Sequence, residues 1–303
     1  MPVDHIESDS RIVVHNRCGE ALPYSRGIMA TSILATGIPT EEAYRLASII
    51  QARLLHHDRR HVTADELVEI TRITLNDDAV DTDTADRWMA WRNAKRSGRP
   101  IIVVLAGAPG VGKSTLATRL AVRLDITRVI TTDSIREVLR LVVPAAVLPE
   151  LHRSSFELIG DSAARGLVDF DRQCSAVGHA AVTVAARLAT ENRPMILEGV
   201  HLVPGEVTHQ LANHPARPIV VERLVAVDDI ERHRHHLDQR RGTEPHRDGQ
   251  RHVERVGAIR TIQEHLLRTA ADEHIARIDA HVAPDITQSI VDEIAAHANL
   301  GLP

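Results

Sequence analysis

The chain has few aromatic residues and few cysteines, and each shortage excludes a class of protein or site. Phe, Trp and Tyr occur only twice each among 303 residues. Proteins that bind single-stranded nucleic acid need several exposed rings on which bases can stack, so this composition argues against that class. The two cysteines, Cys18 and Cys174, are too few for a disulfide framework or a cysteine-based zinc site.

The chain also lacks a basic excess and long apolar segments. Its formal net charge is −5, from 36 basic and 41 acidic residues, which is not the balance of a nucleic-acid-binding protein. We find no signal peptide and no apolar run of about 18 residues, the length that a membrane helix needs. We therefore expect a cytoplasmic protein whose partners are neither nucleic acids nor membranes.

What is present indicates a folded protein of about two domains, because hydrophobic residues make up 43% and charged residues 25% of the chain. The spacing of apolar residues in 1–75 predicts a compact, mostly helical domain. It has a short strand at 12–14, a helix at 25–36, a second helix capped by Thr40, and a third that opens with a Thr63–Glu66 capping box. Residues 76–99 are predicted to form a linker and a connecting helix.

From residue 100 onward the pattern changes to alternating strands and helices. Ile101–Ala106 is an unbroken apolar run, which is typical of a strand buried on both faces of a parallel sheet. Shorter apolar runs predict further strands at 128–131, 195–198, 219–227 and 275–278. Residues 100–303 are therefore predicted to form an α/β domain with a five-stranded, mainly parallel sheet.

The segment that follows the first of these strands matches the phosphate-binding pattern G-x-x-x-x-G-K-[ST]. Its glycines let backbone N–H groups turn toward phosphate oxygens, Lys113 reaches the β- and γ-phosphates, and the Ser114 hydroxyl binds Mg²⁺. The chain has one other lysine, Lys95, so this site keeps a compact ammonium where arginine is the usual cation. The predicted ATP-binding residues are Gly107, Ala108, Pro109, Gly110, Val111, Gly112, Lys113, Ser114 and Thr115.

Four polar residues lie at or just after the ends of predicted strands and should lie at the ligand-binding edge of the sheet. Asp133 is placed to activate an acceptor hydroxyl and Arg136 to bind an anionic substrate, although an N-cap and a surface residue would look the same. Glu198 ends an apolar strand and is predicted to hold Mg²⁺, with a structural carboxylate as the alternative. His201 either contacts the substrate or fills a loop.

Residues 231–251 are rich in arginine and are interrupted by Gly242, Pro245 and Gly249. Such a segment is typical of a kinase lid, and we expect Arg240 and Arg241 to stabilise the transferred phosphoryl group. A salt-bridged helix pair is the alternative. Four histidines lie here, and we predict a partly titrating surface rather than a metal site. They are His233, His235, His236 and His246.

Several stretches together resemble the 2-phosphoglycerate kinase family. They are residues 22–30, 107–114, 132–136, 151–156, 198–204 and 259–266, and they follow the family order through most of the chain. The resemblance implies a P-loop kinase domain that uses ATP and Mg²⁺ to phosphorylate the 3-hydroxyl of 2-phosphoglycerate, giving 2,3-bisphosphoglycerate and ADP. Arg136, Gln173 and His201 would bind the substrate and Asp133 would be the base, unless Asp133 and Glu198 exchange roles.

The same resemblance makes residues 1–75 similar to an ATP-cone, a small regulatory nucleotide-binding module. An ATP-cone usually carries a Lys-Arg pair before its turn, whereas residues 14–19 read V-H-N-R-C-G. The module is therefore expected either to be structural or dimerising or to sense ATP, and a homodimer is left open. Two other functions stay open for the whole chain: a kinase of another phosphorylated polyol or hydroxy acid, and an ATP-gated regulatory NTPase.

Overall fold

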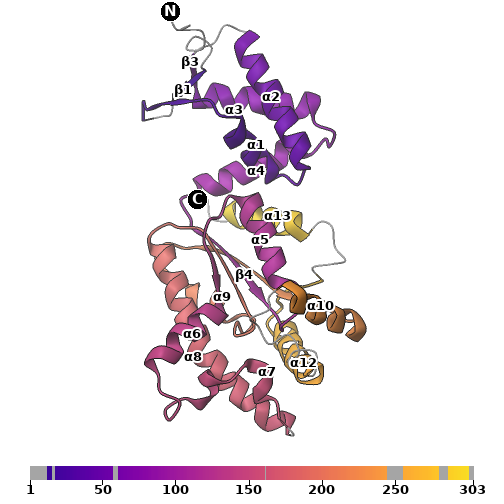
Figure 1. Ribbon diagram of the computed structural model, residues 1–303. Coiled ribbons are helices and arrows are strands. Elements are labelled where there is room, and N and C mark those ends of the chain that lie inside the picture. The colour runs from indigo at the N-terminus through magenta and orange to yellow at the C-terminus, as the bar shows by residue number, and fades with distance from the viewer. Residues whose placement is uncertain are drawn as a thin grey trace, which may run out of the picture. The chain divides into compact units, whose positions relative to one another are not determined.

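The computed structural model describes residues 12–15, 18–56, 61–160, 162–243, 255–279 and 286–299, with the side chains of 239–243 and Asn299 left out. The chain divides into two compact units (Figure 1). One runs to Lys95 and takes in Arg123–Asp125, and the other contains Arg96–Val122 and the chain from Ile126 onward.

The first unit combines a small sheet with four helices. Strand β1 (Val13–His15) lies between β2 (Ala21–Pro23), to which it is antiparallel, and β3 (His61–Thr63), to which it is parallel. The helices are α1 (Arg26–Leu34), α2 (Thr40–His56), α3 (Ala64–Asp78) and α4 (Thr84–Arg96). The predicted capping box is confirmed, because the Thr63 side chain accepts from the Glu66 N–H and the Glu66 carboxylate accepts from the Thr63 N–H.

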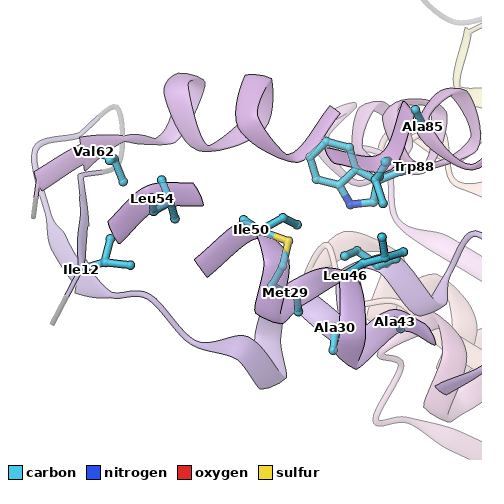
Figure 2. Close-up of a cluster of buried hydrophobic side chains, with 13 residues drawn as sticks. Ile12, Met29, Ala30, Ala43, Leu46, Ile50, Leu54, Val62, Ala85 and Trp88 are labelled. Atoms are coloured by element: carbon cyan, nitrogen blue, oxygen red, sulfur yellow. The ribbon is translucent and has the colours of Figure 1, made fainter. Parts of the chain in front are cut away.

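The core of this unit consists mainly of aliphatic side chains from the sheet and from all four helices, and Figure 2 shows Trp88 beside Leu46 and Ala85. Trp88 is 3% exposed, and its indole N–H donates to Ser32 Oγ at 2.9 Å. Helix α4 is therefore part of the first unit. The sequence predicts a domain over 1–75 and a linker with a connecting helix over 76–99, whereas the compact unit of the structure includes α4 and extends to Lys95.

The second unit is an α/β fold with a five-stranded sheet in the order β5-β6-β4-β7-β8, and every neighbouring pair is parallel. Its strands are β4 (Ile101–Ala106), β5 (Val129–Thr131), β6 (Met195–Gly199), β7 (Ile219–Val225) and β8 (Arg277–Ile278). All five predicted strands are present, and β4 has the predicted bounds. The predicted fold class is confirmed.

Helices cover both faces of this sheet, with α5 and α13 on one side and α8 and α9 on the other (Figure 1). They are α5 (Lys113–Leu124), α6 (Thr132–Val142), α7 (Ser155–Leu158), α8 (Ala163–Thr190), α9 (Glu206–Leu211), α10 (Ile230–Thr243), α12 (Val256–Asp272) and α13 (Ile286–Asn299), with a 3-10 turn η1 (Pro149–His152). Within the described ranges, no helix combines the length and apolarity needed to cross a membrane.

The register of the strands brings the predicted site to one edge. Glu198 lies opposite Leu105 on one side and opposite Thr131 on the other, and Gly199 lies opposite Ala106. Because all these strands are parallel, their carboxyl ends meet at the same edge, where α/β proteins bind ligands.

Candidate active site

The phosphate loop joins β4 to α5, as the sequence predicts. Gly107, Gly110 and Gly112 all have positive φ angles, of 144°, 80° and 92°. A Cβ at Gly107 would lie 2.3 Å from the Val225 carbonyl oxygen of β7, so a side chain is excluded there by the neighbouring strand. The loop is thereby held against the sheet with the start of α5 directly behind it, the arrangement that binds phosphate.

Lys113 is buried within this loop. The residue is 8% exposed, and Nζ donates to the Ala108 carbonyl oxygen at 2.7 Å. The Lys113 side chain thus folds back across the loop, which in proteins with this motif binds phosphate. The binding of the β- and γ-phosphates by Lys113 stays a prediction from the motif.

Ser114 and Glu198 meet across the sheet edge. The Ser114 hydroxyl donates to Glu198 Oε1 at 2.9 Å, and Glu198 is 5% exposed at the end of β6. A hydroxyl and a carboxylate oxygen are the hard donors that Mg²⁺ prefers. In the described part of the chain, no group of three or more His, Cys, Asp or Glu side chains is placed to hold a metal. A cation at this pair would take its other ligands from phosphate oxygens and water.

Asp133 lies on the first turn of α6 and is exposed. It is not the N-cap, because Thr131 Oγ1 occupies that position and accepts from the Ser134 N–H at 3.1 Å. The structural alternative for Asp133 is therefore wrong. Its carboxylate stands at the same sheet edge as Glu198, since Thr131 pairs with Glu198.

Arg136 lies one helical turn further on and is held by backbone carbonyls. Its NH1 donates to the Arg153 carbonyl oxygen at 2.6 Å and contacts that of Leu151 at 3.5 Å, and its NH2 donates to Glu137 at 3.0 Å. The side chain is 13% exposed, so Arg136 is not a free surface residue. Its role toward a substrate stays a prediction.

His201 and Gln173 lie beneath these residues, at 1% and 0% exposure. His201 Nδ1 is 2.9 Å from Thr132 Oγ1, and its Nε2 is 3.1 Å from Gln173 Oε1. Gln173 Nε2 donates to the carbonyl oxygens of Glu150 at 2.5 Å and Arg153 at 2.9 Å. Burial is the main reason that the pKa of His201 falls to about 4. Direct substrate contact by either side chain remains a prediction, and their burial favours a supporting role.

The first part of the predicted lid is a helix that packs on the phosphate loop. His233 Nε2 donates to the Pro109 carbonyl oxygen at 2.8 Å, and a Cβ at Gly110 would lie 2.4 Å from Leu237 Cδ2. His233 is fully buried and burial lowers its pKa, so the prediction of a titrating surface is wrong for this histidine. Arg232 pairs with Asp279.

The two arginines predicted to stabilise the phosphoryl group fall outside the described side chains. Arg240 and Arg241 lie on α10, but their side chains are not described, and His246 lies in 244–254, outside the described residues.

Sequence reasoning missed three contributors to this region. Thr132 Oγ1 lies 2.9 Å from His201 Nδ1, Thr131 caps α6 and pairs with Glu198 in the sheet, and Leu237 lies against Gly110 of the phosphate loop. A threonine pair between a strand and a helix is a usable signal for a cap. Nothing local to Leu237 indicates that it would cover Gly110, because the two are joined only by the fold.

Comparison with known proteins identifies relatives over almost the whole chain. A curated "2-phosphoglycerate kinase" of Methanopyrus kandleri is 34% identical over 295 residues, covering 94% of this chain and 88% of that protein. Proteins of the same name from Pyrococcus furiosus and Methanocaldococcus jannaschii are each 32% identical; they cover 90% and 88% of this chain, and 89% and 86% of their own lengths are matched.

Other comparisons add little. No protein-family model matches the chain. A solved structure from Chloroflexus aurantiacus is 16% identical and covers 65% of this chain and 98% of its own, but the TM-score of 0.40 is too low to support an argument. The identity and coverage of the curated relatives are sufficient: the chain belongs to the 2-phosphoglycerate kinase family.

Proposed function

We propose that this protein transfers the γ-phosphoryl group of Mg-ATP to the 3-hydroxyl of 2-phosphoglycerate, giving 2,3-bisphosphoglycerate and ADP. The observation that carries the proposal is the Ser114–Glu198 pair beside the phosphate loop, in a chain whose relatives are named for this reaction. The phosphate loop supports a nucleotide, and the relatives support the acceptor.

The chain's own residues would bind the nucleotide and its metal in a simple division of labour. Backbone N–H groups of 107–112 bind the phosphates, and Lys113 exchanges the Ala108 carbonyl for the β- and γ-phosphates. Ser114 and Glu198, which share a hydrogen bond at 2.9 Å, would be the protein ligands for Mg²⁺. When bound, Mg²⁺ neutralises the charge that develops on the transferred group. Lys113 adds a fixed positive charge that needs no rearrangement of solvent.

Asp133 and Arg136 would bind the acceptor. Of the two carboxylates, Glu198 is buried against Ser114 while Asp133 is exposed, which favours Glu198 as metal ligand and Asp133 as the base that accepts the hydroxyl proton. Arg136 presents a fixed guanidinium one helical turn away, suited to a carboxylate or phosphate. Arg240 and Arg241 on α10 would stabilise the transferred phosphoryl group, and the cytoplasmic location remains a prediction from sequence.

The test is ADP release from Mg-ATP in the presence of 2-phosphoglycerate, 3-phosphoglycerate, glycerate or no acceptor. We expect strong stimulation by 2-phosphoglycerate alone. Equal slow release in all four reactions would contradict the acceptor and favour an ATP-gated regulator, while stimulation by another acceptor would redefine the substrate.

Two substitutions assign the roles. Lys113→Ala should abolish turnover, whereas Lys95→Ala, at the only other lysine, should not, because Lys95 is 49% exposed and outside the loop. Asp133→Asn should lower kcat by about a hundredfold or more while leaving ATP affinity unchanged. Asp272→Asn, at the exposed last residue of α12, is the matched control. Near-normal turnover of Asp133→Asn would show that another group is the base.

A further inference from the structure

Three neutral side chains form a buried hydrogen-bond network next to Asp133 and Arg136, the residues proposed to bind the acceptor. Thr132, His201 and Gln173 are 0%, 1% and 0% exposed, and they come from α6, the loop after β6, and α8. His201 is hydrogen-bonded to Thr132, 69 residues away, at 2.9 Å and to Gln173, 28 residues away, at 3.1 Å. Because none of the three is at the surface, each donor must meet an acceptor inside the protein.

The direction of every hydrogen bond in this network follows from the partners of Gln173. Gln173 Nε2 faces two carbonyl oxygens, those of Glu150 and Arg153, which can only accept. The amide oxygen therefore points at His201 and accepts, so His201 Nε2 must carry the proton. His201 Nδ1 then has a lone pair and accepts from the Thr132 hydroxyl. One tautomer of His201 satisfies all of these partners.

The two ends of this hydrogen-bond network lie next to the residues that would hold the acceptor, Asp133 and Arg136. Thr132 directly precedes Asp133, and its side chain leaves no room for a Cβ at Gly199, which would lie 1.7 Å from Thr132 Oγ1. At the other end, the Arg153 carbonyl that accepts from Gln173 also accepts from Arg136 at 2.6 Å. Gln173 thus fixes the carbonyl that directs the Arg136 guanidinium.

These contacts connect the residues proposed to bind the acceptor with the Ser114–Glu198 pair proposed to bind Mg²⁺. His201 follows Glu198 by three residues, in the loop that leaves β6, while Thr132 and Arg136 lie on α6. A shift of His201 or Gln173 would move Arg136 and the start of α6 relative to the Ser114–Glu198 pair. Misplacement of reacting groups by about 1 Å can cost a hundredfold in rate.

We propose that His201 and Gln173 are positioning residues that determine acceptor specificity: through Thr132 and the Arg153 carbonyl they fix where Asp133 and Arg136 stand relative to the phosphoryl donor. This inference rests on the proposed function. A rigid spacing between base and guanidinium distinguishes 2-phosphoglycerate from 3-phosphoglycerate, because these isomers differ in which oxygen is free and which carries the phosphate.

The experiment measures kcat and KM for ATP and for both phosphoglycerates. Gln173→Leu keeps the volume of the side chain but removes its hydrogen bonds. We expect kcat/KM for 2-phosphoglycerate to fall about a hundredfold and the preference over 3-phosphoglycerate to shrink, with KM for ATP within about twofold of wild type. Val177→Ala, a fully buried apolar change one turn along α8, is the matched control and should alter none of these ratios.

Two further measurements keep the test decisive if Gln173→Leu does not fold. His201→Asn offers an oxygen acceptor to Thr132 and His201→Leu offers none, so kcat/KM should fall in the order wild type, Asn, Leu. Nitrogen-15 NMR of the wild-type imidazole should show the Nε2–H tautomer. An Nδ1–H tautomer would overturn the inference. So would variants whose kcat/KM values for ATP and for the acceptor fall equally, as expected for a destabilised protein. Either result is compatible with an active wild-type kinase. A wild type inactive toward 2-phosphoglycerate would overturn both.

Discussion

The buried ring of His201 should make the folded protein lose stability in mild acid. Its pKa falls from 6.5 to about 4, first because burial removes water from the charged form, and further because Arg136 and Lys113 repel it. Asp133 opposes this in part. Between these two pH values the unfolded chain binds a proton that the folded ring does not, so acid favours unfolding.

The size of this effect follows from the two pKa values. Above about pH 7 the ring is neutral in both the folded and the unfolded state, so it does not lower the free energy of unfolding. At pH 5 the free energy of unfolding should be lower by about 2 kcal/mol, and at pH 4 by about 3 kcal/mol, from this one residue.

The assay is urea unfolding at pH 8 and pH 5 for wild type and His201→Gln, which cannot titrate. Wild type should lose about 2 kcal/mol more than the variant between these pH values. Taking the difference between the two proteins removes the contribution of His233 and of the carboxylates. His179→Gln, at an exposed position on α8, should follow wild type. Parallel stability profiles for wild type and His201→Gln would refute the assignment of a neutral buried ring.

Three further predictions follow from local geometry. Gly110→Ala places a Cβ 2.4 Å from Leu237 Cδ2 at a φ of +80°, so KM for ATP should rise about tenfold; an unchanged KM would show that α10 moves aside freely. Thr63→Ala removes the capping box of α3 and should lower the free energy of unfolding of the first unit by about 1 kcal/mol, measured by urea unfolding, whereas no loss would mean the cap is redundant. Burial raises the pKa of the Cys174 thiol, so a thiol reagent should label exposed Cys18 quickly and Cys174 only on unfolding; two fast thiols in the native protein would contradict the burial.

Much of the fold could be predicted because its signals are local. The unbroken apolar run of β4 marks a strand buried on both faces, and the capping box of α3 marks a helix start. The end of the first domain was misplaced because α4 carries mostly polar residues and its contribution rests on a few buried side chains. Trp88 finds Ser32 and the aliphatic core only once the helices have assembled.

The site was predictable to a different degree for different residues. The phosphate loop needs particular residues at consecutive positions, so Gly107–Ser114 could be identified without knowing any partner. The histidines could not be sorted in the same way. His233 and His201 are ordinary polar residues in the sequence, and burial, which only the fold creates, is the largest cause of the lowered pKa of each.

By itself the sequence determined the α/β class, the phosphate loop and the family resemblance, because these depend on residue types at fixed spacings along the chain. Only the tertiary structure decided that Ser114 meets Glu198 and that Gln173 orients His201. These pairs are 84 and 28 residues apart, and they meet because strand order, register and desolvation bring them together. The sequence predicted that Ser114 and Glu198 would both bind Mg²⁺, but none of those three properties is carried by any single segment, so no local pattern could have shown these two hydrogen bonds.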